Sequence, residues 1–146
     1  MFRVEVVLLL AGLCAVGSAI RAQSVAVKGN LVCHGRPYAN GQVKLYEKDR
    51  ISKDDLLAEV KTDSRGYFEI SGTQREWLSI RPKITIVHAC DTRDSACEKK
   101  FDIEIEKKYV SSGSTPTKFW NAGNIELALD RVTQTTDCKG SKGSKH

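Results

Sequence analysis

Long hydrophobic runs are scarce in this chain of 146 residues. Beyond residue 16 no stretch is apolar enough to cross a bilayer, which takes about 20 such residues. The sequence also lacks an Asn-X-Ser/Thr site for N-glycosylation and a Lys-Asp-Glu-Leu type of retention signal. We therefore expect no later membrane span, no N-linked glycan and no retention in the endoplasmic reticulum.

A basic stripe with interleaved aromatic residues is also absent. The net charge is +5, and residues 1–22 hold two arginines and one glutamate, so the remainder has 21 − 17 = +4. Three lysines within residues 139–146 carry much of that excess. We expect this tail to be disordered and solvated, with a weak attraction to anionic lipid or acidic glycans as the alternative. The nearly neutral body argues against a dedicated nucleic-acid-binding protein.

The N-terminus has the pattern of a secretory signal peptide. Arg3 precedes an apolar run over residues 6–16, and small residues follow it. Cleavage is expected after Ala19 or Ala22, which makes residues 1–22 the signal peptide and predicts a secreted, extracellular protein. An uncleaved membrane anchor is the alternative, but the run is shorter than a membrane span.

Alternation of apolar and polar residues dominates the rest of the chain. This period of two predicts strands with one buried face. The turn residues Asp63–Gly66 predict a β-hairpin between two of these strands, with Gly72 ending the second, and Asn121–Gly123 reads as another turn. Beyond Asp137 only Cys138 is expected to be ordered. Short strands are expected near residues 25–33, 43–47, 56–62, 67–71, 83–89, 98–110 and 125–129.

No amphipathic helix and no internal repeat interrupts this series of strands. Seven or eight short strands separated by turns are typical of an all-β, antiparallel β-sandwich of the immunoglobulin-like kind. We expect one such domain over residues 23–138.

Four cysteines remain once Cys14 leaves with the signal peptide, and an even count in a secreted chain predicts two disulfides. Three pairings are possible. Cys90 and Cys97 flank a short polar loop, so we expect them to pair, which leaves Cys33 to pair with Cys138.

Six segments are distinctive in their order and spacing: Gly29–Pro37, Val43–Tyr46, Thr62–Gly72, His88–Cys90, Cys97–Phe101 and Tyr109–Gly113. Together they resemble the nematode transthyretin-like family, and the similarity runs from about Val25 to Cys138. The resemblance implies a secreted transthyretin-type β-sandwich from an animal, with extracellular roles proposed for members: carrying small hydrophobic ligands, bridging cell surfaces or acting at a host interface.

The wider superfamily includes hydroxyisourate hydrolase, which uses paired histidines, an arginine and a C-terminal Tyr-Arg-Gly-Ser. This chain ends in Lys-Gly-Ser-Lys-His. A histidine pair of His34 and His88 would need a nearby acid or nucleophile, which the local sequence does not nominate. We expect no enzyme and no catalytic residues.

Cofactors and metals are not expected either. His88, Cys90 and Cys97 could ligate zinc together with Asp91 or Asp94, but an oxidising compartment favours disulfides. The acidic residues of the 91–98 loop lack EF-hand spacing for calcium. Gly140–Lys145 has the composition of a phosphate-binding loop, but no strand precedes it and no helix follows.

Exposed basic loops are the remaining candidates for function. Lys48 and Arg50 in the charged loop 48–55, and the pair Lys107 and Lys108, are candidate partner-binding residues, since loops on rigid sandwiches often bind. Trp77, Phe119 and Trp120 are aromatic enough to anchor an interface or to pack in the core. We keep two hypotheses: binding or bridging of an extracellular protein or an anionic lipid surface, and carriage of a small hydrophobic ligand as in transthyretin.

Overall fold

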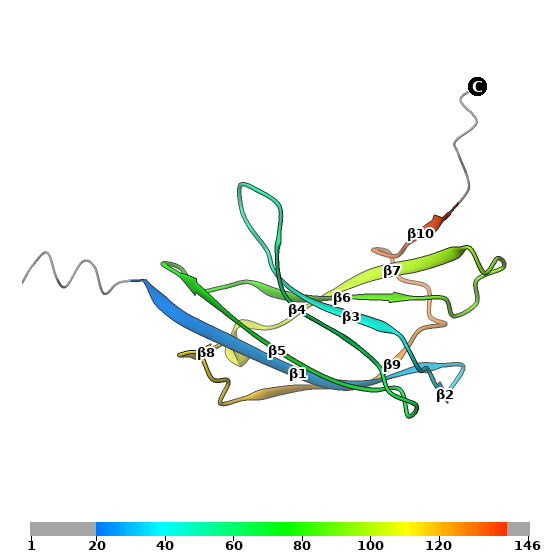
Figure 1. Cartoon of the computed structure of the whole chain (residues 1–146), viewed down its shortest axis with the longest axis horizontal. Helices are drawn as coiled ribbons and strands as arrows, with labels where there is room; N and C mark the ends of the chain where they lie inside the picture. Colours follow the sequence, from blue (N-terminus) through cyan, green and yellow to red (C-terminus); the bar gives the residue numbers. More distant parts are fainter. Residues whose placement is uncertain (1–19, 140–146) are drawn as a thin grey trace, which may run out of the picture.

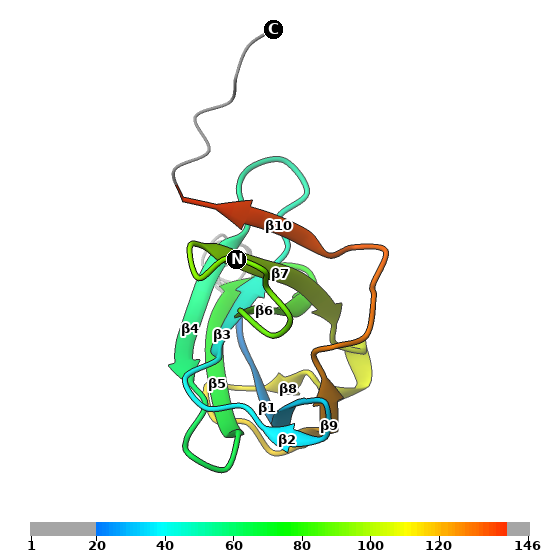
Figure 2. The ribbon, with the colours of Figure 1, turned by 90° about the vertical axis from the view of Figure 1, so that its right-hand side faces the viewer.

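The computed structural model describes residues 20–139, which fold into two facing β-sheets (Figure 1). One sheet is built around the long strand β1, and the other has the order β10-β7-β6-β3-β4. Figure 2 looks along the sandwich and shows the two layers enclosing a common interior. The elements are β1 (Arg21–Cys33), β2 (Arg36–Pro37), β3 (Gln42–Glu47), β4 (Asp55–Lys61), β5 (Tyr67–Glu76), β6 (Pro82–His88), β7 (Cys97–Glu104), the 3-10 helix η1 (Lys107–Tyr109), β8 (Ser111–Ser112), β9 (Phe119–Glu126) and β10 (Thr135–Cys138).

The all-β sandwich predicted from the sequence is confirmed, with ten strands in the described residues instead of seven or eight. All strand pairs are antiparallel except one, because β9 runs parallel to β1. β1 also pairs with β2, β5 and β8, so it lies at the centre of its sheet.

The core lies between the sheets, where the period-two residues of each strand point inward. On β3 the buried positions are Val43, Leu45 and Glu47, and the residues between them are half-buried. The same alternation places Phe68 and Ile70 of β5 opposite them. Other fully buried core side chains are Val25, Val27, Leu31, Ile84, Ile86, Phe101 and Leu127.

The β-hairpin predicted around Asp63–Gly66 is wrong. The turn forms as expected, with Asp63 accepting hydrogen bonds from the N–H groups of Arg65 and Tyr67. However, β4 pairs with β3 in one sheet and β5 pairs with β1 in the other, so the turn carries the chain across the sandwich. Turn residues specify a reversal of the chain but not the sheet that receives the next strand.

Gly72 does not end its strand, since β5 continues to Glu76. The glycine is needed because the sheets approach closely here. A Cβ atom at this position would lie 2.7 Å from the Cβ of Leu57 on β4. The prediction mistook a packing requirement for a strand terminator.

Three further boundaries differ at the C-terminal side. Residues 121–123 belong to β9, where the register with β1 shifts between Lys28 and Asn30 and Gly123 takes a positive φ of 65°. The last strand of the core ends at Glu126, and Leu129 beyond it is exposed. Residues 107–109 form η1 instead of extending the preceding strand.

β10 was not predicted because its four residues, Thr-Thr-Asp-Cys, have no apolar alternation. It is an edge strand, held by main-chain pairing with β7, in which Cys138 lies opposite Cys97. Main-chain hydrogen bonds leave no trace in the hydropathy pattern.

The predicted disulfide pairing is also wrong. Cys33 is bonded to Cys90, and Cys97 to Cys138. The first bond crosses the sandwich from the end of β1 to the loop after β6, and the second follows from the β7–β10 register. Closeness in sequence suggested Cys90 with Cys97, but the unpredicted strand supplies the partner of Cys97.

Residues 1–19 and 140–146 lie outside the described part of the chain, as do most of the predicted signal peptide and the predicted tail. Arg21 and Ala22 are described, and both pair with β5 as the first residues of β1. Cleavage after Ala19 would leave this strand whole, whereas cleavage after Ala22 would remove its first two residues. Both cleavage sites stay predictions.

Candidate functional site: a basic groove at one end of the sandwich

The segment 77–81, between β5 and β6, is fixed across one end of the sandwich. Gln23 of β1 holds it from below: its Nε2 donates to the carbonyl of Leu78 at 2.8 Å, and its Oε1 accepts from the N–H of Ile80 at 2.9 Å. The side chain of Ile80 is 1% exposed and anchors the segment in the interior. The N–H of Lys48 donates to the carbonyl of Arg81 at 2.9 Å, which ties the neighbouring loop to it.

A groove of about 420 Å³ opens beside this segment. Loops from three separate parts of the chain meet there. They give the groove an apolar floor and a basic rim. The lining residues are Lys48, Arg50, Leu78, Ser79, Ile80, Arg81, Pro82, Glu104, Ile105 and Lys107.

Loop 48–54, which projects from the body in Figure 1, has its own internal structure. Asp49 Oδ1 accepts from the N–H of Ile51 at 2.9 Å, and the N–H of Asp49 donates to Asp54 Oδ1 at 3.0 Å. Asp54 in turn pairs with Lys83 Nζ at 2.8 Å, and this hydrogen bond lowers the pKa of the Asp54 carboxyl. The loop therefore presents Arg50 from a tethered turn.

The charges in the groove are unequal. Lys48 Nζ lies 2.5 Å from Glu104 Oε1, and this hydrogen bond lowers the pKa of the glutamate. Arg50, Arg81 and Lys107 form no salt bridge with any residue in the described range 20–139. With four cations and one carboxylate, the groove carries a formal charge of +3 and suits an acidic ligand group.

Three of the four predicted partner-binding residues therefore meet in one place: Lys48, Arg50 and Lys107. Lys108 does not join them. Its Nζ lies 3.3 Å from Glu106 and 5.3 Å from the centre of the Tyr109 ring.

Sequence reasoning missed Arg81 and Leu78. Both lie in the segment 73–81, whose apolar residues have no clear period, so no element could be assigned there.

Trp77 was singled out as an aromatic anchor. It is 61% exposed next to Leu78 at 63%. Of the other two aromatic candidates, Trp120 packs against the core and Phe119 is half-exposed on β9.

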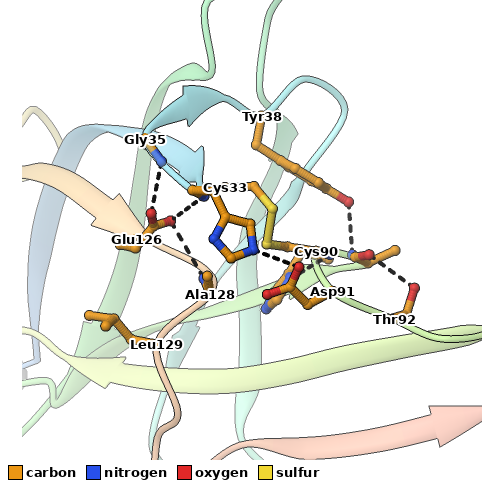
Figure 3. Close-up of a disulfide and its surroundings, with 12 residues drawn as sticks. Cys33, Gly35, Tyr38, Cys90, Asp91, Thr92, Glu126, Ala128 and Leu129 are labelled. Atoms are coloured by element: carbon orange, nitrogen blue, oxygen red, sulfur yellow. Dashed lines mark hydrogen bonds and ion pairs between the residues drawn. A yellow bond between two sulfur atoms is a disulfide. The ribbon is translucent and has the colours of Figure 1, made fainter.

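The opposite end of the sandwich holds the disulfide between Cys33 and Cys90, which Figure 3 shows with its surroundings. His34 and Asp91 directly follow the bonded Cys33 and Cys90, and both have positive φ angles, of 51° and 56°. His34 Nε2 lies 2.7 Å from Asp91 Oδ1, so the two residues form a second link beside the disulfide. Glu126 of β9 closes this corner.

His88 is buried, and its partners differ from those of His34. Burial is the main cause that lowers the pKa of its imidazole from 6.5 to about 4, opposed by the side-chain amide of Gln134. Nδ1 accepts from the N–H of Cys90 at 3.1 Å, and the ring packs edge-on against Tyr38 and Phe101. The side chain is a neutral core residue near pH 7.

The cysteines of the zinc site considered from the sequence have other partners in the structure. Cys33, Cys90 and Cys97 are in disulfides, so none of them offers a thiolate for zinc. Asp94 accepts from the N–H of Ala96 within its own loop. Gly140–Lys145 lies outside the described residues.

The sequence is similar to known proteins over most of its length. Residues 28–106 match the model of the transthyretin-like family. The chain belongs to the transthyretin-like family. Two Caenorhabditis elegans relatives are transthyretin-like protein 33, 43% identical over 86% of this chain and 90% of its own, and transthyretin-like protein 5, 40% identical over 86% and 94%. The predicted resemblance is therefore confirmed.

Among solved structures, a 9R-lipoxygenase from Cyanothece matches 71% of this chain and 16% of its own, with a TM-score of 0.39 and 17% identity. The names of the two Caenorhabditis elegans relatives state a fold and no reaction. In residues 20–139 the structure contains no helix long and apolar enough to traverse a bilayer.

Proposed function

We propose that this transthyretin-like protein is secreted and, without catalysing a reaction, binds an acidic group of an extracellular partner in the basic groove. The supporting observation is the convergence of Lys48, Arg50 and Lys107 with Arg81 around one hollow. Secretion is supported by the signal-like N-terminus and by the two disulfides, which persist in oxidising compartments.

The shape of the groove favours a discrete acidic group over a flat charged surface. Ile80, Pro82 and Ile105 line its floor, so a ligand that enters is partly removed from water. A charge-assisted hydrogen bond gains strength in such a place. A phospholipid headgroup and an acidic side chain share this chemistry, and the exposed Trp77 and Leu78 could contact the remainder of either ligand.

The test measures binding of the full secreted chain to two probes. One is vesicles of phosphatidylcholine with or without phosphatidylserine, and the other is proteins captured from the animal's cell surfaces. We expect Lys48→Gln combined with Arg50→Gln and Lys107→Gln to weaken binding at least tenfold, and added salt to weaken wild-type binding.

A matched control removes the same charge elsewhere. Lys61, Lys99 and Lys100 lie near the disulfide end and outside the groove, so their combined change to Gln should leave binding within twofold. Equal losses in both triple variants would show a general charge effect. Binding of wild type to neither probe, or binding indifferent to the groove residues, would overturn the proposal. The probe that binds distinguishes lipid from protein.

The apolar floor also gives some support to the second hypothesis, carriage of a small hydrophobic ligand. A neutral hydrophobic dye separates the two. Dye binding that persists in the groove triple variant and in high salt would favour the carrier hypothesis over an acidic ligand.

A further inference from the structure

Three carboxylates lie together beside the groove: Glu47 is buried, Glu76 is half-buried and Asp55 is exposed. Glu47 is the last inward residue of β3, after Val43 and Leu45. Asp55 opens β4 directly opposite it, and Glu76 ends β5 on the other sheet. One oxygen from each of the three lies within 4.8 Å of the others.

The position of Glu47 breaks the apolar pattern of its strand. The residue is only 8% exposed, and its Oε2 is buried with no hydrogen-bond partner among the described residues. A buried, unpartnered carboxylate oxygen destabilises a fold unless something compensates it.

No basic side chain supplies that compensation within the described residues. None of Glu47, Asp55 and Glu76 forms a salt bridge there, although Lys48 and Lys83 lie close in sequence or register and pair with other acids. Gln74 Nε2 donates to Asp55 Oδ2 at 3.1 Å, which satisfies one oxygen of the cluster. Burial is the main cause that raises the pKa of Glu47; the charges of Glu76 and Asp55 add to it, and the nearby side-chain amide of Gln74 opposes it.

We propose that Glu47, Asp55 and Glu76 bind a calcium ion between the two sheets. All three ligands are carboxylate oxygens, which suit a hard cation and not zinc. Calcium binds oxygens at about 2.4 Å, so two ligands on one ion are at most about 4.8 Å apart, and the three oxygens lie within that limit of one another. Magnesium requires a tighter octahedron, with bonds of about 2.0–2.1 Å.

The ion would join three strands at the end that the disulfides leave unlinked. β3 and β4 belong to one sheet and β5 to the other, so calcium would connect the layers there. Extracellular modules bind calcium with dissociation constants of about 0.1–1 mM, a range that three carboxylates with partial solvent access fit. The inference does not depend on the proposed function, because none of these residues lines the 420 Å³ groove.

The test is thermal unfolding of the full secreted chain, after treatment with a chelator, in 10 mM calcium or magnesium chloride at about constant ionic strength. We expect calcium to raise Tm by roughly 5 °C and magnesium to raise it by less than half as much. Glu76→Gln should remove most of the calcium shift. The matched control Glu98→Gln, an exposed glutamate on β7 at the other end, should keep it.

Glu47→Gln gives a second readout that a purely structural cluster would not share. Without calcium it should raise Tm, since it removes a buried negative charge from an acidic cluster, yet it should respond to calcium weakly or not at all. Terbium luminescence excited through Trp77, the neighbour of Glu76, reports binding directly in wild type. Absence of both the calcium shift and terbium binding, or calcium shifts unchanged in both glutamine variants, would overturn the proposal.

Discussion

Where β1 ends and β7 begins, the disulfide between Cys33 and Cys90 joins the two sheets, and the ion pair of His34 and Asp91 lies beside it. The second disulfide, Cys97 to Cys138, lies at the same end and links two strands of one sheet. At the other end, segment 77–81 and loop 48–54 surround a groove whose cations largely lack partners. Exposed apolar side chains, Trp77, Leu78 and Ile51, also gather there.

The disulfide end therefore contributes mainly to stability, and the groove end is suited to recognition. Linking the strands at one end fixes their register, so the opposite end can carry unpaired charge without the fold depending on it. Exposed apolar groups are unfavourable for an isolated domain but provide binding energy when a partner covers them, and unpaired cations remain available to an acidic ligand. The predictions below test whether stability and binding separate in this way.

The largest effect should come from the disulfide between Cys33 and Cys90. It closes a sequence separation of 57 residues, and the chain-entropy model gives about 4 kcal/mol for such a loop. We expect Cys33→Ala with Cys90→Ala to lower the free energy of unfolding in urea by about that amount. The groove triple variant serves as the comparison and should change it little. A loss in the disulfide variant no larger than that of the groove variant would refute the division between the ends.

Next in size is the pH dependence that His88 imposes at the same end. The pKa of its imidazole in the folded state, about 4, is below the unfolded value of 6.5, so the unfolded chain binds more protons between these two values. The contribution of His88 to the free energy of unfolding is therefore fully present above pH 6.5. It falls by about 3 kcal/mol as the pH drops from 6.5 toward 4.

Urea unfolding at intervals from pH 7 to pH 4 measures this loss. His88→Phe cannot take up a proton and should flatten the slope, whatever its effect on absolute stability. The carboxyl of Glu47, whose pKa is raised, contributes with the opposite sign, because protonation favours its folded form. An equal slope in wild type and in the His88 variant would show that other groups control the acid sensitivity.

The strands with alternating residues were predictable because each records the burial of its own face. β3, β6 and β7 follow their patterns closely, and the sandwich follows from them. What failed depends on partners far away in sequence. Gly72 is required because Leu57 approaches it from another strand, and β10 forms because its main chain pairs with β7. The disulfide pairing failed for the same reason, since the partner of Cys97 is fixed by that register.

The groove was predictable in part. Lys48, Arg50 and Lys107 lie in polar loops, and exposure alone nominated them. Their convergence could not be predicted, because three loops distant in sequence meet only after the sheets pack. Arg81 was missed since its segment is held by the side chain of Gln23, a contact across 57 residues that no local pattern announces.

A smaller effect tests how the disulfide end holds its turn. The carboxylate of Glu126 accepts from the N–H groups of His34 at 3.1 Å and Gly35 at 2.8 Å, two donors that the turn leaves without main-chain partners. Glu126→Gln keeps the shape but halves the acceptors and removes the charge. We expect a loss of about 1 kcal/mol in urea unfolding.

The control for that variant is Glu69→Gln, an exposed glutamate on β5, which should be neutral. Hydrogen exchange of the amide of Gly35 adds a local readout, since it should accelerate in the Glu126 variant. Unchanged exchange with a lower stability would place the role of Glu126 elsewhere, for instance in the attraction between its carboxylate and the guanidinium of Arg131.

The smallest effect on stability is expected at the groove, from Lys48→Gln. This change removes the ion pair with Glu104, whose side chain is 73% exposed, and water already screens such a pair. Thermal unfolding of the variant should therefore match wild type within error. Binding should respond differently. Without Lys48 the negative charge of Glu104 is no longer neutralised, so the rim is less positive and the affinity for an acidic probe falls. Adding Glu104→Gln to the Lys48 variant should restore part of that affinity, because it removes the one carboxylate among the described residues that line the groove. A lower Tm without any change in binding would mean that this end supports the fold and does not recognise a ligand.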